Sequence, residues 1–166
     1  DHNWSNIPLI DYLSHWLWGR MHDKDFTIVF ADVVAAKRFG GIHIKPLMIY
    51  DRKKLLYMTS EPEKWELKRG NIKIDPATGI RHPDTYMLET QDKDISLKLG
   101  FSAGKIFERV DLLEGFDPLR RWFIRTFKAN PGMLSFLSIG QGELTLKGRK
   151  KALAGAMLHE FFDLRK

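Results

Sequence analysis

Asp32 is the carboxylate in this sequence whose surroundings best suit acid chemistry. It follows the apolar run 28–31 in a segment that alternates as a strand does. Asp32 is an even number of residues away from Phe26, Ile28 and Phe30, so in a strand the four side chains lie on the same face. If those side chains face inward, the carboxyl is desolvated and its pKa is raised. A neutral buried acid beside aromatic rings could protonate an alkene or anchor a ligand hydroxyl. The alternative is a side chain that points outward or bonds a neighbouring backbone amide.

Tryptophan side chains supply a second set of candidate residues. Trp16 and Trp18 lie two positions apart in an alternating segment, so both can line an interior together while Leu17 points the other way. The chain opens with Asp1-His2-Asn3-Trp4, where an acid, an imidazole, an amide and an indole are adjacent. This cluster could take part in catalysis, or it could form a local network that holds a turn.

The composition excludes several kinds of site. The 166 residues include no cysteine, which excludes disulfides and thiolate zinc sites. No two of the six histidines have the helical metal spacing H-x-x-x-H, so we expect neither a metal nor a cofactor. The net charge is +6, but the only dense basic run is 147–151, where Gly148 lies between two alternating segments. This run predicts a hairpin tip with solvated charges rather than a nucleic-acid site.

Period-two alternation dominates the chain and predicts the elements that must position these residues. The expected strands are 16–21, 26–34, 43–50, 55–60, 65–74, 85–89, 95–101, 107–113, 138–146 and 152–164. Antiparallel strands at hairpin spacing favour a closed barrel or a sandwich. With 43% hydrophobic residues, a chain of this length can bury a sizeable core. We therefore expect an all-β fold in a single domain, residues 1–166.

One segment, 117–128, breaks the alternation and predicts a helix. Asp117 suits the N-cap, Pro118 the first helical position, and the run 130–132 stops the helix. Four large apolar residues fall on one face of this helix: Leu119, Trp122, Phe123 and Phe127. Their burial would contribute on the order of 6–10 kcal/mol before entropy, which favours a helix that braces one end of the barrel. The basic residues on the other faces leave peripheral contact with an anionic membrane as the alternative.

Several of these segments together resemble one known family. The opening Asp1-His2-Asn3-Trp4, the strand Gly140-Gln141-Gly142-Glu143-Leu144 and the ending 155–161 are similar to motifs of the AttH/CrtC-type (carotenoid hydratase-like) two-barrel lipocalin-like superfamily. The resemblance implies an antiparallel lipocalin-like barrel that is the second half of a longer protein. It also implies that His2 and Trp4 act with an aspartate that follows a Tyr-x pair on a later strand. Phe30-Ala31-Asp32 matches that motif, with the acid kept and the phenol replaced.

Three classes of function follow from these observations. The first is a module that binds an apolar lipid or isoprenoid-like ligand, with Trp4, Trp16, Trp18 and Phe30 in contact with it. The second is half of a hydratase or cyclase that needs the upstream barrel as its partner, with Asp32 and His2 as catalytic residues. The third is a structural or interaction barrel that its own side chains fill. A cavity would distinguish the first class from the third.

Overall fold

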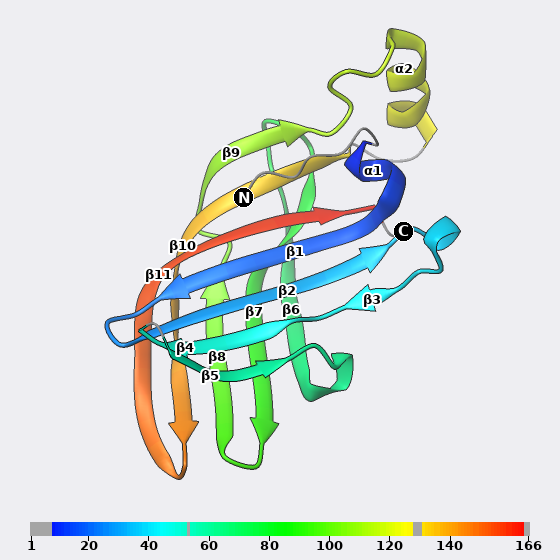
Figure 1. Ribbon diagram of the computed structural model, residues 1–166. Helices are drawn as coiled ribbons and strands as arrows, with labels where there is room; N and C mark the ends of the chain where they lie inside the picture. The colour runs from blue at the N-terminus through cyan, green and yellow to red at the C-terminus, as the bar shows by residue number, and fades with distance from the viewer. Residues whose placement is uncertain (1–7, 53, 128–130, 165–166) are drawn as a thin grey trace.

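The computed structural model describes residues 8–52, 54–127 and 131–164. Its strands are β1 (Leu13–His22), β2 (Phe26–Ala35), β3 (His43–Ile44), β4 (Leu47–Asp51), β5 (Lys54–Thr59), β6 (Trp65–Ile74), β7 (Arg81–Asp92), β8 (Ile95–Ser102), β9 (Lys105–Asp111), β10 (Gly132–Leu146) and β11 (Arg149–Asp163). Its helices are α1 (Leu9–Tyr12), α2 (Pro118–Phe127) and two short 3-10 turns, η1 (Lys37–Phe39) and η2 (Pro62–Lys64). The expected all-β class is confirmed (Figure 1).

The strands form one antiparallel sheet that rolls into a lipocalin-like barrel. Nine strands follow the order β5-β4-β2-β1-β11-β10-β8-β7-β6, while β3 pairs with β2 and β9 pairs with β10 (Figure 1). Side-chain hydrogen bonds connect β6, at one end of this order, to the segment between β3 and β4. Buried Lys45 donates to the carbonyl oxygens of Pro62 and Trp65 at 3.0 and 2.7 Å, and Trp65 Nε1 donates to the carbonyl of Lys45 at 2.8 Å. These bonds join the β3–β4 segment to the start of β6.

Strand boundaries differ from the expected ones where prolines occur. The expected strand 43–50 is divided into β3 and β4 around Pro46, which has no N–H for a ladder but accepts a hydrogen bond from the amide of Ala31. Strand β7 begins at Arg81 instead of 85 and includes Pro83, opposite Ile72. Strand β10 begins at Gly132 instead of 138 because β9 provides a partner for its first residues. That partner is distant in sequence, so local patterning did not reveal it.

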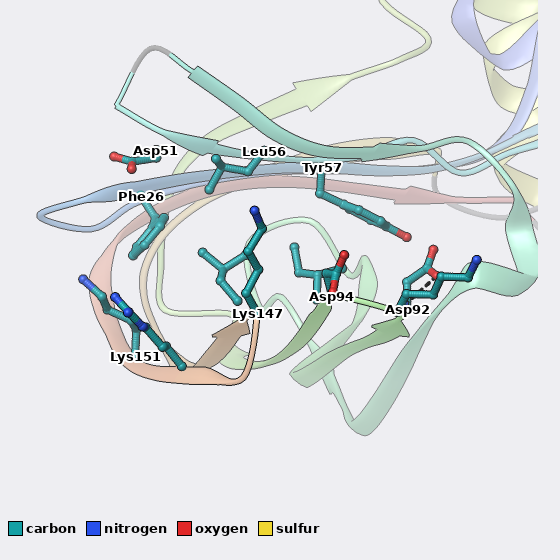
Figure 2. A pocket seen from close by; sticks show the side chains of 12 residues that line it. Phe26, Asp51, Leu56, Tyr57, Asp92, Asp94, Lys147 and Lys151 are labelled. Atoms are coloured by element: carbon teal, nitrogen blue, oxygen red, sulfur yellow. Dashed lines mark hydrogen bonds between the residues drawn. The ribbon is translucent and has the colours of Figure 1, made fainter.

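The basic run forms a tight hairpin, as expected. Leu146 pairs with Arg149, which leaves Lys147 and Gly148 as a two-residue turn with φ values of 47° and 76°. Positive φ at both positions is the signature of a type I′ turn, whose twist matches that of the strands. Lys147 projects from this tip toward the region between β5 and the β7–β8 turn (Figure 2).

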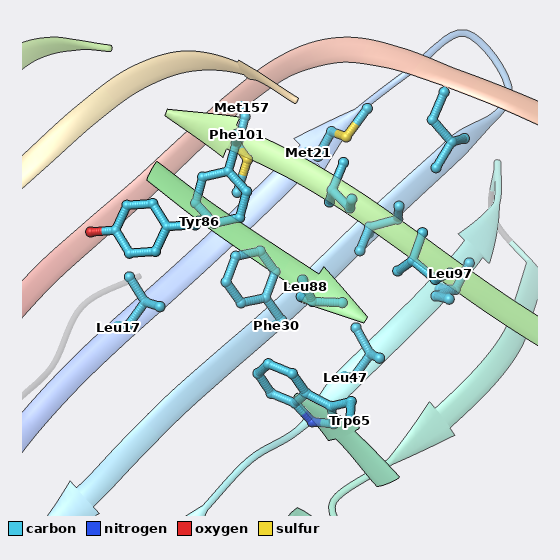
Figure 3. Packing of buried hydrophobic residues seen from close by; sticks show 14 of the residues in the cluster. Leu17, Met21, Phe30, Leu47, Trp65, Tyr86, Leu88, Leu97, Phe101 and Met157 are labelled. Carbon is cyan, nitrogen blue, oxygen red and sulfur yellow. The ribbon is translucent and has the colours of Figure 1, made fainter. Parts of the chain in front are cut away.

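Alternating side chains fill the barrel with a packed core. Phe30 is fully buried and lies between the rings of Trp65 and Phe101, at centroid distances of 6.1 and 5.7 Å (Figure 3). Aliphatic and thioether side chains surround these rings, among them Leu17, Met21, Leu47, Leu88, Leu97 and Met157. The middle of the barrel is therefore occupied by its own side chains.

Polar rings share the core with these apolar residues. His159 is fully buried and stacks on Phe136 at 4.8 Å, while its Nδ1 lies 3.3 Å from the hydroxyl of Ser138. Burial lowers the pKa of His159 to about 3, with a smaller contribution in the same direction from the nearby His82. Tyr86 stacks on Phe101 at 4.7 Å, and burial raises the pKa of its phenol. Both side chains are therefore neutral at physiological pH.

Two glycines in β10 and β11 allow close contact between strands. A Cβ at Gly155 would overlap the backbone carbonyl of His22, and a Cβ at Gly142 would overlap that of Lys98. A glycine inside a strand commonly marks such a close backbone approach or a bend. Long β10 and β11 curve around the barrel here (Figure 1). Close packing between strands thus explains the glycines in the two segments that the sequence analysis singled out.

Helix α2 has the expected boundaries but not the expected packing. Asp117 caps it by accepting a hydrogen bond from the amide of Arg120 at 2.9 Å. Its apolar face is exposed, with Leu119 at 74% and Trp122 at 58% of full exposure, and the helix projects away from the sheet (Figure 1). The prediction that α2 braces the barrel was therefore wrong. No helix within the described residues is long and apolar enough to cross a membrane. Peripheral membrane contact stays a prediction.

Candidate functional site

Asp32 faces the barrel interior, on the side that its parity predicted. Phe26, Ile28, Phe30 and Asp32 are all buried along β2. Phe30 is packed within the core, so its predicted role as a ligand contact stays a prediction. Asp32 lies toward the end of β2, where the interior changes from apolar to charged.

A network of charged side chains surrounds Asp32. Its Oδ1 lies 2.5 Å from Nε2 of His43, and its Oδ2 accepts a hydrogen bond from Nη2 of Arg69 at 2.5 Å. The buried His15 lies 3.5 Å from the same Oδ2. These partners come from β3, β6 and β1, so the network ties strands from opposite parts of the sheet together.

His15 occupies the centre of this network and lies between two carboxylates. Its Nε2 lies 2.7 Å from Nη2 of Arg69, and its Nδ1 lies 3.2 Å from Oδ2 of Asp163. Arginine only donates hydrogen bonds, so Nε2 of His15 must be the acceptor of this bond. The ring proton is then on Nδ1, which faces the carboxylate of Asp163. The arrangement orients one imidazole by a carboxylate on one side and a guanidinium on the other.

The pKa of Asp32 is lowered, which corrects the prediction of a neutral acid. Burial alone would raise this pKa, but the adjacent His15 and His43 side chains and the charge of Arg69 outweigh it. The sequence showed the apolar neighbours of Asp32 along its own strand and not these three partners. Asp32 is an ionised carboxylate at neutral pH, suited to orienting an imidazole or accepting a proton rather than to protonating an alkene.

The tryptophans near Asp32 face outward, which is a second correction. Trp16 and Trp18 do share one face of β1, but Leu17 is the fully buried residue and the indoles are half-buried on the opposite face. Nε1 of Trp16 donates to Oε2 of Glu160 at 3.2 Å on that outer face. The indoles therefore do not line the interior, and a role in binding stays a prediction. His2 and Trp4 lie outside the described residues.

A pocket of about 820 Å³ lies at the other end of the barrel (Figure 2). Phe26, at the start of β2, borders it, six residues before Asp32, which is about 20 Å along an extended strand. Its apolar lining consists of Phe26, Leu56, Tyr57, Ile95 and Leu146. The pocket is thus a half-apolar hollow at the mouth and not a cavity through the core.

Charged side chains form the rim of this pocket. The cations are Lys93, Lys147, Arg149 and Lys151, and the carboxylates are Asp51, Asp92 and Asp94. Three of the four cations belong to the β10–β11 hairpin. Nζ of Lys151 lies 5.7 Å from the ring centroid of Phe26, so a cation stands next to the apolar lining.

The sequence alone did not predict that the residues of the charge network, or those of the pocket, lie together. Of the network, only Asp32 was predicted, although His15 has the parity of the buried residues Leu13 and Leu17 and could have been placed inward by that signal. The pocket residues come from seven strands and two turns, most of them distant in sequence. Within the described part of the chain, no group of three or more His, Asp or Glu side chains is arranged to hold a metal ion.

Comparison with known proteins supports the fold. No protein-family model matches the sequence, and no curated protein matches it. Among solved structures, the chain is similar to CghA bound to Sch210972, with a TM-score of 0.62, 10% identity and coverage of 93% of this chain and 42% of that one. It is also similar to kievitone hydratase from Nectria haematococca (TM-score 0.56, 13% identity, 97% and 41% covered) and to a candidate AttH from Nitrosomonas europaea (0.57, 11%, 98% and 42%).

These structural neighbours show that the chain has a lipocalin-like fold. All three are AttH/CrtC-type lipocalin-like proteins, so the resemblance seen in the sequence is confirmed at the level of the fold. The chain spans only 41–42% of the length of each neighbour. At 10–13% identity the likeness establishes architecture, and function has to be argued from the site.

Proposed function

We propose that this chain is a lipocalin-like module that binds an elongated apolar ligand, a lipid or isoprenoid-like molecule, in the pocket at the barrel mouth. The observation that carries this proposal is the pocket itself, because about 820 Å³ lies within the range of small-molecule sites and its lining is half apolar. The filled core is what a purely structural barrel would also have, but the pocket gives a ligand a place to bind. The Sch210972 bound by CghA supports a small-molecule ligand.

A pair of variants on β5 tests this proposal. Leu56 lines the pocket, whereas Met58 is exposed on the same strand. Leu56→Glu places a charge against the ligand tail and should weaken binding of a fluorescent apolar probe by tenfold or more, since burying an unpaired charge is costly. Met58→Glu, the matched control, should leave binding within about twofold. Equal affinity of both variants and the parent protein would show that the ligand does not occupy this pocket.

We also propose that the chain is the second half of a two-barrel protein and that the upstream barrel is its partner. The coverage of only 41–42% of each neighbour supports this. The outer face of the barrel exposes Leu137 and Ile139 on β10, and on β1, the next strand but one, it carries the half-buried Trp16 and Trp18. Such an apolar surface is typical of an interface. Sedimentation should show self-association of the isolated chain that Ile139→Lys reduces. A monomer that gives no signal with an apolar-surface dye would contradict this proposal.

The charge network favours a second candidate, half of a hydratase or cyclase that acts together with the upstream barrel. The specific observation is His15, fixed between Asp163 and Arg69 and next to Asp32, as in sites that move protons. Asp32 and His2 are the proposed catalytic residues, with Asp32 acting as a carboxylate. In the two-barrel protein, Asp32→Asn should abolish water addition or cyclisation. Full activity of that variant would eliminate Asp32 from the chemistry.

A further inference from the structure

We infer that the ligand of the mouth pocket is an anionic amphiphile, whose carboxylate or phosphate head is bound by the β10–β11 hairpin and whose tail lies on the apolar lining. This inference rests on the proposed function and adds the class of ligand. A neutral apolar molecule would need only the lining. The arrangement of the cations around that lining points to a charged head.

The hairpin presents three cations to the pocket. Lys147, Arg149 and Lys151 line the pocket, and among the described residues none of the three forms an ion pair with a carboxylate. Lys150, between them, does not line the pocket and binds Oε1 of Glu143 at 2.9 Å. The hairpin therefore neutralises the one lysine that faces away from the pocket and leaves its neighbours available to a ligand.

The turn geometry fixes where this charge stands. The type I′ turn at Lys147 and Gly148 is a rigid connection, so the position of Lys147 is set by the backbone rather than by a long loop. Figure 2 shows the Lys147 side chain between Leu56 and the β7–β8 turn, at the boundary between the apolar lining and the rim. A head bound there lets a tail extend over Leu56 and Phe26.

The rim carboxylates belong to other elements than the hairpin cations. Asp92 accepts a hydrogen bond from the amide of Lys93 at 2.8 Å and lies 3.9 Å from Nζ of Lys64. Asp94 lies in the adjoining β7–β8 turn, where its backbone carbonyl accepts a hydrogen bond from the amide of Lys147 at 2.8 Å, and Asp51 ends β4. The carboxylates repel an anion, so they favour a head that binds the hairpin cations over one that binds elsewhere on the rim. The unlike charges of the rim thus restrict where the head can bind.

A matched series of ligands tests the head group. Dodecanoic acid, dodecyl phosphate and dodecanol share one tail and differ in charge. Displacement of a fluorescent apolar probe should show that at least one of the two anions binds about tenfold or more tightly than the alcohol, the ratio expected for one charge-assisted hydrogen bond. The preference should shrink as salt is raised, because the rim is open to solvent. Comparison of the two anions distinguishes a carboxylate head from a phosphate head.

Variants in the hairpin locate the effect. Lys147→Asn with Lys151→Gln removes two pocket cations, and asparagine tolerates the positive φ at position 147. This double variant should lose the preference for the anion and keep its affinity for dodecanol within about twofold. Lys150→Gln, the control, should keep the preference. Thermal unfolding of each variant verifies that the barrel is intact.

The outcomes separate the two proposals. Equal binding of the anions and the alcohol, or an anion preference that survives the double variant, overturns the anionic head but leaves an apolar ligand in the pocket. A failure of all three ligands to displace the probe, or displacement that Leu56→Glu does not affect, overturns the proposed function and the inference with it.

Discussion

Replacing Asp32 by asparagine should destabilise the barrel at neutral pH, because the ionised carboxylate holds three side chains together. Asparagine keeps the shape of the side chain but not its charge. Arg69 would lose its carboxylate partner at 2.5 Å and keep its hydrogen bond to His15 and the more distant carboxylate of Asp163, at 3.9 Å from its Nη1. His43 and His15 would each face a neutral amide.

The size of the effect follows from burial and partner number. Removing one member of a buried, hydrogen-bonded charge pair costs about 3–5 kcal/mol, but His43 is half exposed and Arg69 is partly exposed, so solvent screens part of this loss. We expect a loss of about 2–4 kcal/mol in the free energy of unfolding. For a domain of this size that corresponds to a fall in Tm of roughly 4–16 °C. If Asp32 were neutral, the substitution should instead change the free energy of unfolding by less than about 1 kcal/mol, since asparagine closely mimics a protonated carboxyl.

The pH dependence gives a second readout with a definite sign. The folded pKa of Asp32 lies below the unfolded value of about 3.9, so its stabilising contribution is present above about pH 5 and is lost as the pH falls further. The difference between the parent protein and Asp32→Asn should therefore narrow between pH 6 and pH 3. Urea unfolding at several pH values measures it, and a double-mutant cycle with Arg69→Met should give a coupling of about 1–3 kcal/mol. A variant as stable as the parent at pH 7, or a difference that widens in acid, would refute the ionised network.

Two further predictions concern the core. His159 has a folded pKa of about 3 against about 6.5 unfolded, so the parent protein should lose stability as the pH falls below 6.5, by at most about 1.4 kcal/mol per pH unit from this group. His159→Phe should lack that loss, and urea midpoints at pH 7 and pH 4.5 that shift equally in both proteins would contradict the assignment. Gly155→Ala should cost about 3 kcal/mol or more, because its Cβ would overlap the carbonyl of His22. Gly148→Ala, where nothing crowds a Cβ and only the positive φ is strained, should cost about 1–2 kcal/mol, and equal melting temperatures of the two variants would be inconsistent with the close strand contact.

Local patterns in the sequence predicted local structure well. Alternation predicted the strand that carries Asp32 and the face on which Asp32 lies, and glycine between charged residues predicted the hairpin tip. Asp117 and Pro118 predicted where α2 begins. Each of these features depends on the chemistry of residues within a few positions of one another, which a single sequence contains.

The errors arose where distant segments decide the outcome. Period two divides β1 into two faces but does not say which face is inside, and the large indoles of Trp16 and Trp18 suggested the wrong one. The pKa of Asp32 depends on Arg69, which is brought close only when the sheet rolls up and β6 approaches β2. The exposure of α2 likewise depends on what the rest of the chain offers to pack against it.

The separation of the network from the pocket limits how the two proposed functions can be combined. Between Phe26 at the pocket and Asp32 in the network, the inward-facing residues of β2 are Ile28 and Phe30, and both are almost completely buried in the packed core. A ligand in the mouth pocket is therefore kept from Asp32 by about 20 Å of filled barrel. A substrate for chemistry at Asp32 would have to approach from the other end, where His43 is partly exposed. Binding at the mouth and catalysis at the network thus stand as independent proposals, and the loss of one through mutation should leave the other intact.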